Sequence, residues 1–219
     1  ELLPQHGVSC RTQGGLPLAI EGRLQPGCFS LPGKVSSQFI TGLLLALPLL
    51  PEDSEICLTT PLESAAYVAM TVQAMDAFGV HVERTANGWH VPGQQSYRPC
   101  RHTVEGDWSQ AAFFLAAGAL GGDVSVRGLR EDSLQGDKAI ADLLAQGGAR
   151  LIWENGALRC TADQWHGIAI DASQIPDLVP ILAAAFSLAE GETVIHHAER
   201  LRLKESDRLA AMAEGLTAI

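Results

Sequence analysis

The chain repeats one pattern three times, and this repeat restricts its fold more than any other feature. Each copy reads as a helix end, a glycine, a short strand, a tight turn and a second strand. The copies are LLPQHGVSCRTQGGLPLAI, AMDAFGVHVERTANGWHV and LLAQGGARLIWENGALRC. Their marker glycines, Gly7, Gly79 and Gly147, lie 72 and 68 residues apart, and a glycine in this position commonly ends a helix. Asn87-Gly88 and Asn155-Gly156 are typical of two-residue hairpin turns.

Two further sequence features recur at fixed distances after these glycines. Thirty residues after each glycine, at or near the start of an apolar segment, lie Ser37, Ser109 and Asp177. Another 27 residues on, near the start of a second helical segment, lie Ser64, Gly136 and Lys204. We therefore expect the first three residues to occupy equivalent helix starts. A unit of about 70 residues with alternating strands and helices predicts an α/β or α+β fold.

Charge and composition exclude several classes of partner. The formal net charge of −10 argues against nucleic acid and anionic membranes, so an anionic ligand would need a local cluster of cations. The longest apolar run, 39–50, is too short for a membrane span. The five cysteines show no metal-ligand spacing, and we expect reduced thiols in a cytoplasmic protein. Because the chain begins at Glu1 and ends inside an apparent helix, we expect a fragment.

Polar residues open two of the apolar segments. Ser36, Ser37 and Gln38 stand directly before a long apolar run. One hydroxyl suffices to cap a helix, whereas two hydroxyls, an amide and free helix N–H groups suit a phosphate, and both interpretations remain open. Ser64 opens a later segment, with Tyr67 one turn along the same face. Taken alone, that pair is typical of a capped helix with a half-buried tyrosine.

Charged residues mark two positions in the last third of the chain. Asp177 follows a proline at a helix start, where it either caps the helix or serves as a general base. Lys204 and Arg208 have i,i+4 spacing, and Glu205 lies three residues before Arg208. Two cations one turn apart repel each other unless an anion lies between them, which favours a binding role. The alternative is a solvated face with weak ion pairs.

Other polar and aromatic residues receive no functional role. Asp107, Gln135 and Asp137 lie near glycines and are expected in turns or caps. His196-His197 has adjacent spacing without a third ligand nearby, so we expect no metal site there. The tryptophans form no stripe and are expected to pack in the core or on hairpins.

Six motifs, in order along the whole chain, resemble those of the 5-enolpyruvylshikimate-3-phosphate (EPSP) synthase family. They are SSQF, SAAYVAMT, EGDWSQAAFFLAAGAL, SLQGD, IPDLVPILAAAF and RLKESDRL, of which SSQF and KESDR are the specific ones. The resemblance implies two domains of repeated βαβαββ units in an inside-out, barrel-like arrangement, with the active site in the cleft between them. Residues 1–104 would belong to the first domain and 105–219 to the second, truncated at both ends to about the middle half of the enzyme.

The resemblance also implies a reaction and a site. Phosphoenolpyruvate and shikimate 3-phosphate would react in the shikimate pathway to chorismate and aromatic amino acids, releasing phosphate, with no metal or organic cofactor. Asp177 would be the base and Glu205 the acid. Shikimate 3-phosphate would contact Ser36, Ser37, Gln38, Ser64, Tyr67, Asp177 and Lys204. Phosphoenolpyruvate would contact Gln38 and Arg208. The intact enzyme would be a monomer in the bacterial cytoplasm.

The sequence departs from the family pattern at several points. Ala65 and Ala66 stand where the family usually has a basic residue and proline, and Arg200 replaces an asparagine that touches substrate in some members. The family's early Lys-Ser and Arg group, its Gly-Asn-Ala-Gly-Thr loop and its late His-Arg and Lys groups are absent. We therefore expect no turnover from the 219-residue chain alone. The alternatives are a UDP-N-acetylglucosamine enolpyruvyl transferase and a non-catalytic module of the same fold.

Overall fold

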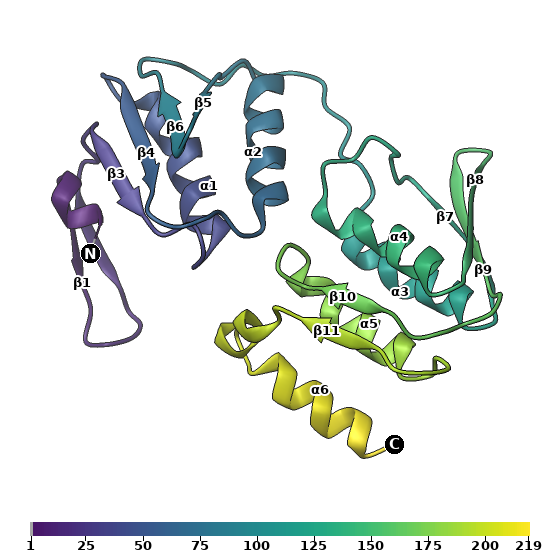
Figure 1. The fold of residues 1–219 in the computed structure, drawn as a ribbon. Coiled ribbons are helices and arrows are strands. Elements are labelled where there is room, and N and C mark those ends of the chain that lie inside the picture. Colours follow the sequence, from purple (N-terminus) through teal and green to yellow (C-terminus); the bar gives the residue numbers. More distant parts are fainter. Residues whose placement is uncertain (1) are drawn as a thin grey trace. The chain divides into compact units, whose positions relative to one another are not determined.

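The structure, a computed structural model, describes residues 2–219 as two compact units. One unit is Glu1–His102 and the other is Thr103–Ile219, as the colours of Figure 1 allow the reader to follow. The expected boundary between residues 104 and 105 concerns the domains of a longer enzyme and stays a prediction. No helix within residues 2–219 is long and apolar enough to cross a bilayer.

The first unit contains one complete βαβαββ repeat. In chain order its elements are β3 (Cys28–Leu31), α1 (Ser37–Ala46), the 3₁₀ turn η2 (Leu47–Leu49), β4 (Ser54–Leu58), α2 (Ala65–Ala77), β5 (Glu83–Thr85) and β6 (Gly88–Val91). The strands form a sheet in the order β3-β4-β6-β5. β3 and β4 run parallel, while β6 is antiparallel to both of its neighbours. The predicted repeat is thus confirmed here in full.

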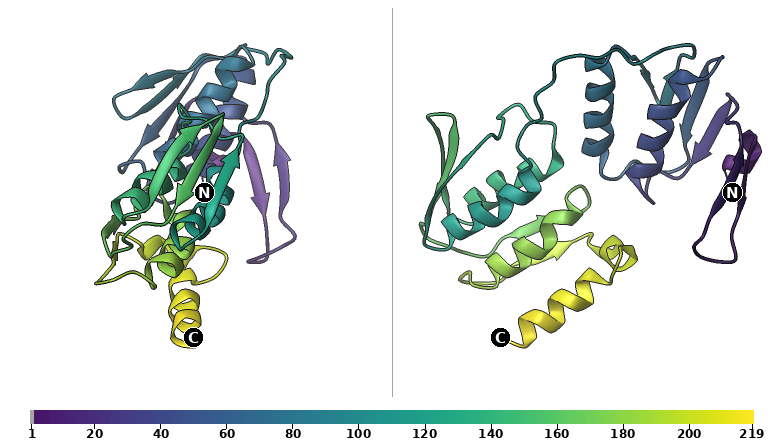
Figure 2. Two further views of the ribbon diagram at one scale, coloured as in Figure 1. Left: turned by 90° about the vertical axis from the view of Figure 1, so that its right-hand side faces the viewer. Right: turned by 180° about the vertical axis from the view of Figure 1, so that it is seen from behind.

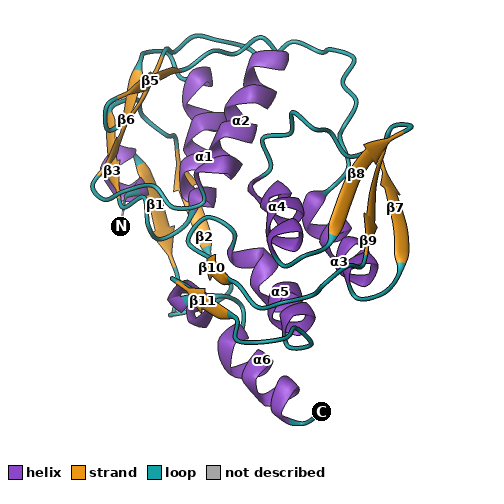
Figure 3. Ribbon diagram, turned by 45° about the vertical axis from the view of Figure 1, so that its right-hand side comes forward, coloured by secondary structure: helices purple, strands orange, loops and turns teal. Residues whose placement is uncertain are grey.

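The core of this unit lies between the sheet and its two helices (Figure 3). Strand residues alternate between the two faces, so every second residue points toward the helices. Buried members from the strands are Phe29, Leu31, Ile56, Trp89 and Val91, and those from the helices include Ile40, Leu43, Leu44, Val68 and Met75. The opposite face of the sheet is left with polar and sulfur-bearing side chains.

A separate hairpin precedes this repeat. It consists of the 3₁₀ turn η1 (Leu3–His6), β1 (Val8–Arg11) and β2 (Ala19–Gly22). The connection between the two strands spans residues 12–18, so the prediction of a tight turn is wrong here. In the β5–β6 hairpin the turn is Ala86-Asn87, one residue earlier than predicted, because Gly88 already pairs with Thr85.

The second unit contains parts of two repeats (Figure 2). The first part comprises α3 (Trp108–Ala119), β7 (Asp123–Arg127), η3 (Gly136–Lys138), α4 (Ala139–Gln146), β8 (Arg150–Glu154) and β9 (Ala157–Thr161), with an antiparallel sheet in the order β7-β9-β8. The second part comprises β10 (Ala169–Asp171), η4 (Pro176–Leu178), α5 (Val179–Phe186), β11 (Val194–His196), η5 (Glu199–Leu203) and α6 (Arg208–Thr217). β10 and β11 pair in parallel.

The sequence landmarks fall where the repeat predicts. Ser37 is the first residue of α1, Ser109 is the second of α3, and Asp177 lies in η4 directly before α5, which confirms their equivalent helix starts. The Asn155-Gly156 turn is confirmed, with both residues at positive φ (50° and 70°). Gly147 itself keeps a helical φ of −74°, and the left-handed residue that ends α4 is Gly148, one position later.

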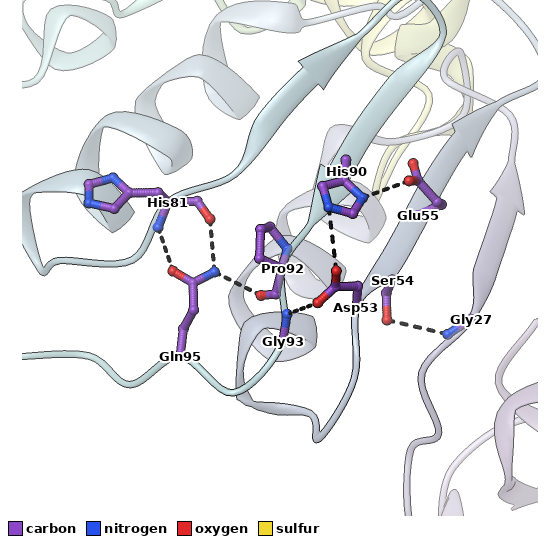
Figure 4. A network of polar contacts seen from close by, with 9 residues as sticks. All are labelled: Gly27, Asp53, Ser54, Glu55, His81, His90, Pro92, Gly93 and Gln95. Atoms are coloured by element: carbon purple, nitrogen blue, oxygen red, sulfur yellow. Dashed lines mark hydrogen bonds and ion pairs between the residues drawn. The ribbon is translucent and has the colours of Figure 1, made fainter.

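The outer face of the first unit's sheet carries a histidine network that makes stability depend on pH (Figure 4). Nδ1 of His90 lies 2.7 Å from Oε1 of Glu55, and its Nε2 lies 3.7 Å from Oδ2 of Asp53. The hydrogen bond with Glu55 raises the pKa of His90 above 6.5, although partial burial opposes the shift. A raised pKa contributes stability that is complete below about pH 6.5 and is lost as pH rises through the folded-state value.

We therefore expect the free energy of unfolding of this unit to fall as pH rises above about 6.5 and through the folded-state pKa of His90. Glu55→Gln should flatten that part of the profile, whereas the exposed-residue variant Glu52→Gln should leave it unchanged. Urea unfolding at several pH values measures both. An equal slope in the wild type and in Glu55→Gln would show that this pair does not cause the dependence.

Candidate functional site

The first group of polar residues lies at the start of α1. Ser36 is the N-cap: its backbone is extended, with φ at −161°, and its Oγ accepts a hydrogen bond from the Gln38 N–H at 3.2 Å. Ser37 is buried and Gln38 is exposed. Capping is therefore confirmed and occupies one hydroxyl. The second hydroxyl and the amide exceed what the helix requires.

The starts of α1 and α2 lie at the same edge of the sheet. Because β3 and β4 are parallel neighbours, the loops that follow them begin at the same end. The two loops are joined by two hydrogen bonds: the Lys34 N–H donates to the side-chain Oγ1 of Thr60 at 3.1 Å, and the Glu63 N–H donates to the Gly33 backbone oxygen at 3.2 Å. Both positive helix ends thus face one side, an arrangement that favours an anion.

Ser64 does not cap α2, so that interpretation is wrong. Its backbone is left-handed, with φ at 53°, and its side chain makes no capping hydrogen bond, although it has other polar contacts. A non-glycine residue in this region is held there by its surroundings, and such strain is common at functional sites. Tyr67 is half-buried one turn later, as predicted.

The second group lies in the other unit, where the chain leaves β10 and β11. These strands are parallel, so the segments after them start at one edge of their pair. Oδ1 of Asp177 lies 2.7 Å from Nη1 of Arg208 and 3.7 Å from Nζ of Lys204. About a third or less of each of these side chains is exposed: 34% for Asp177, 31% for Lys204 and 25% for Arg208.

This group resolves the repulsion expected between the two cations. The carboxylate of Asp177 lies next to both, so the required anion is supplied by the chain itself. The prediction that Lys204 and Arg208 lie one turn apart on a helix is wrong, because α6 begins at Arg208 and Lys204 lies in the bend before it. Asp177 pairs with these cations, and the structure assigns no side-chain cap to η4.

Glu205 completes the second group from the opposite side of Arg208. Its Oε1 accepts from Nε of Arg208 at 2.9 Å and lies 2.8 Å from Nη2. A backbone N–H and this guanidinium hold the pKa of Glu205 below its ordinary value, so it is ionised at neutral pH. Burial lowers the pKa of Arg208, but the hydrogen bonds that it donates to Asp177 and Glu205 outweigh this and raise it.

Two sets of polar contacts at helix starts were not predicted. Asp207 caps α6 by accepting from the Ala210 N–H at 3.0 Å, and its other oxygen lies 2.9 Å from Nη1 of Arg202. Gln135 bridges the start of α3, accepting from the Trp108 N–H and donating to the Gly106 oxygen, both at 2.9 Å. The spacing Asp-x-x-Ala at a helix start could have indicated the first contact. No local signal indicates the second.

A cavity of about 550 Å³ in the first unit does not match the chemistry of these groups. Its lining is almost entirely apolar, with Gln38 at its margin beside Phe39 and Leu43. An anionic substrate would lose its hydration there without gaining a cation, so we place no phosphate in it. Within residues 2–219 no cluster of His, Cys, Asp and Glu side chains is arranged to hold a metal ion.

The cap at α1 can be tested without a substrate. We expect Ser36→Ala to lower the free energy of unfolding of the first unit by about 1 kcal/mol, since one helix N–H loses its partner. Ser36→Asn should retain most of it, because an amide oxygen can also cap. Ser30→Ala, on the exposed face of β3, is the matched control. Urea unfolding of the 219-residue chain measures these values, and an unchanged Ser36→Ala would contradict the cap.

The chain is similar to known proteins over its whole length. Residues 1–219 match the family described as EPSP synthase (3-phosphoshikimate 1-carboxyvinyltransferase). A 3-phosphoshikimate 1-carboxyvinyltransferase of Clostridium acetobutylicum is 49% identical over 92% of this chain and 47% of that protein. One of Methanococcus maripaludis is 38% identical over 99% of this chain and 53% of that protein. The chain thus spans about half the length of these relatives.

The chain also superposes on solved structures of enolpyruvyl transferases. A structure described as EPSP synthase from Acinetobacter baumannii superposes with a TM-score of 0.77 at 28% identity, over 98% of this chain and 51% of that one. The enolpyruvyl transferase NikO from Streptomyces tendae superposes with a TM-score of 0.68 at 18% identity, a likeness of fold alone. Repeated βαβαββ units of the enolpyruvyl transferase type are therefore the architecture of this chain.

Proposed function

The chain belongs to the EPSP synthase family, and from this premise we propose that it supplies part of the active site of a 3-phosphoshikimate 1-carboxyvinyltransferase. The intact enzyme would transfer the enolpyruvyl group of phosphoenolpyruvate to the 5-hydroxyl of shikimate 3-phosphate and release phosphate. The observation that carries the proposal is the carboxylate of Asp177 held beside Lys204 and Arg208, because it provides a base and two cations in one place.

The first unit would bind the phosphate of shikimate 3-phosphate. Ser36 and Ser37 offer hydroxyls at the start of α1, and Ser64 lies at the start of α2 on the same edge of the sheet. Gln38 would reach both substrates, and Tyr67 would pack against the ring. This assignment is supported by the two helix N-termini, which stabilise an anion without the cation that other members carry next to Ser64.

The second unit would perform the proton transfers. Asp177 would take the proton of the 5-hydroxyl as that oxygen attacks the enolpyruvyl carbon, and Lys204 would hold the neighbouring hydroxyls. Glu205 would give a proton to the methylene carbon, which yields a tetrahedral intermediate. The tetrahedral carbon, which bears both the new ether oxygen and the phosphate oxygen, then loses phosphate. The neighbouring methyl group gives up a proton, which re-forms the double bond of the enolpyruvyl ether.

Glu205 must gain a proton before it can act as the acid. A backbone N–H and the guanidinium of Arg208 keep the pKa of Glu205 low. If Arg208 turns to the anionic groups of phosphoenolpyruvate, Glu205 loses this hydrogen bond and gains a negative neighbour, and both changes raise the pKa of a carboxyl group. Substrate binding would thus switch Glu205 from carboxylate to acid.

The effect of Arg208 on Glu205 is measurable in the chain alone. We expect Arg208→Met to raise the pKa of Glu205 toward its ordinary value, because the guanidinium that stabilises the carboxylate is removed. Carbon-detected NMR titration of the glutamate side chains gives the value directly. Arg202→Met, which removes a guanidinium paired with Asp207 instead, is the control and should leave Glu205 unchanged. An unaltered Glu205 in Arg208→Met would contradict the switch.

Phosphate release by the intact enzyme that contains this chain tests the proposed function. Release that requires both shikimate 3-phosphate and phosphoenolpyruvate supports it. Release with UDP-N-acetylglucosamine in place of shikimate 3-phosphate would assign the chain to the other transferase, and no release with either would favour a non-catalytic module. We expect the 219-residue chain alone to show no turnover.

The setting of this activity is also part of the proposal. The enzyme would act as a monomer in the bacterial cytoplasm, in the shikimate pathway to aromatic amino acids. The cysteines of the described chain are free thiols, which supports a reducing compartment. Size-exclusion chromatography with light scattering on the intact enzyme measures the oligomeric state.

A further inference from the structure

Two cysteines meet on the outer face of the first unit's sheet, away from the residues of the proposed function. Sγ of Cys28 on β3 and Sγ of Cys57 on β4 are 3.2 Å apart. Cys28 is exposed and Cys57 is partly so. A disulfide bond is about 2.05 Å long, so the sulfurs need to approach by only about 1.2 Å to be bonded. Cys10, Cys100 and Cys160 have no sulfur partner within the described chain.

The strand register explains why the two sulfurs face each other. Cys28 lies opposite Glu55, and Cys57 lies opposite Ser30, so the cysteines occupy a diagonal across the parallel pair on one face. The other face of these strands carries Phe29, Leu31 and Ile56 in the core. The thiols are therefore on the side that the helices do not cover, where small reagents can reach them.

We propose that Cys28 and Cys57 form a dithiol modification site that closes reversibly into a disulfide across β3 and β4. Its co-reactant is a low-molecular-weight disulfide. The thiolate of Cys28, the more exposed sulfur, attacks that disulfide and expels one thiol, which leaves a mixed disulfide on the protein. The sulfur of Cys57 then loses its proton, attacks the Cys28 sulfur and expels the second thiol. The protein loses two electrons and two protons, and the small disulfide becomes two thiols.

The geometry predicts a bond that is easily reduced. Neighbouring strands lie about 4.8 Å apart and a parallel strand rises about 3.3 Å per residue, so a diagonal offset by two residues places Cα atoms about 8 Å apart. Most disulfides have Cα separations of about 4.4–6.8 Å, so β3 must shift slightly toward β4 when the bond forms. β3 can do so because it is a four-residue strand at the edge of the sheet. Strained and exposed disulfides are the labile ones, so the site would respond to redox conditions rather than stay oxidised.

Hydrogen bonds at both ends of β3 hold the strand beside β4, so the two sulfurs are close together before the reaction. The Gly27 N–H donates to Oγ of Ser54 at 3.3 Å, a contact drawn in Figure 4, and the Thr59 N–H donates to the Leu31 oxygen at 3.0 Å. A hydrogen bond between the thiols raises the pKa of Cys57, which together with the greater exposure of Cys28 favours Cys28 as the sulfur that attacks first.

The test uses the 219-residue chain with Cys10→Ser and Cys100→Ser, which removes the other exposed thiols. After incubation with oxidised glutathione and alkylation, we expect a mass loss of two hydrogen atoms, one peptide pair linked through residues 28 and 57, and full reversal by dithiothreitol. Adding Cys28→Ser or Cys57→Ser should stop the reaction at a single glutathione adduct.

Each possible result of this experiment either supports or contradicts the proposal. A product that carries only glutathione adducts, or that links two chains, would overturn the proposal, as would no reaction at all. Circular dichroism confirms that each variant is folded, and because either serine variant gives the same single-thiol control, failure of one to fold does not remove the test. The result does not depend on the proposed enzymatic function.

Discussion

Replacing Asp177 by asparagine is expected to lower kcat of the intact enzyme by about 10²- to 10⁴-fold, the usual contribution of a general base. Asparagine keeps the size of the side chain and an oxygen that Arg208 and Lys204 can approach, but it cannot take a proton from a hydroxyl. KM should therefore change less than kcat. Steady-state phosphate release with both substrates measures the two constants.

Asp171→Asn provides the matched control for this experiment. Asp171 ends β10 in the same unit and is also a carboxylate in an ion pair, with its Oδ2 3.1 Å from Nδ1 of His197. It has no role in the proposed reaction, so its replacement should leave kcat nearly unchanged. Full activity of Asp177→Asn would contradict the assignment of the base, and an equal loss in both variants would point to damage to the unit instead.

Replacing Phe29 by alanine is expected to lower the free energy of unfolding of the first unit by about 3–5 kcal/mol. The Phe29 side chain has 0% of its surface exposed, and its ring stacks on His6 with centroids 3.7 Å apart. Truncation leaves a cavity between β3 and the helices and removes this stacking. Hydrogen exchange of peptides from 28–91 across a urea series reports this unit separately from the other.

Phe39→Ala is the control within the same unit. Phe39 is 59% exposed on α1, and exposed substitutions usually change stability by about 0.5 kcal/mol or less. The two variants remove the same atoms from the same unit, so their difference isolates burial. Equal effects of the two truncations would mean that Phe29 does not anchor the core.

Local sequence signals were sufficient for the start of α1 and for the turn between β8 and β9. Ser36 at the start of α1 and Asn155-Gly156 between β8 and β9 act through their own backbone, so short patterns reveal them. Local signals gave the wrong position for a turn where the pairing of strands determines it. Gly88 was expected in a turn, but it joins the ladder opposite Thr85 and Cys57, and the turn moves back by one residue.

Local sequence patterns indicated the residues of the candidate site one by one, and only the family resemblance implied that they act together. The spacing of Lys204 and Arg208 suggested an anion between them, but the sequence does not identify which one. Asp177 lies 31 residues before Arg208, and contacts over such distances have no local pattern. The left-handed backbone of Ser64 likewise depends on the loops around it and overrides its usual preference for capping.

The sequence alone determined the repeat, the position of the polar residues at helix starts and the family resemblance, because each depends on the order of residue types along the chain. The tertiary structure decided which of these residues meet. Parallel pairing of β3 with β4 brings Ser36 and Ser64 to one edge, and pairing of β10 with β11 brings Asp177 to Lys204 and Arg208. Which strands pair is decided by the packing of the whole unit, and short-range sequence does not contain it.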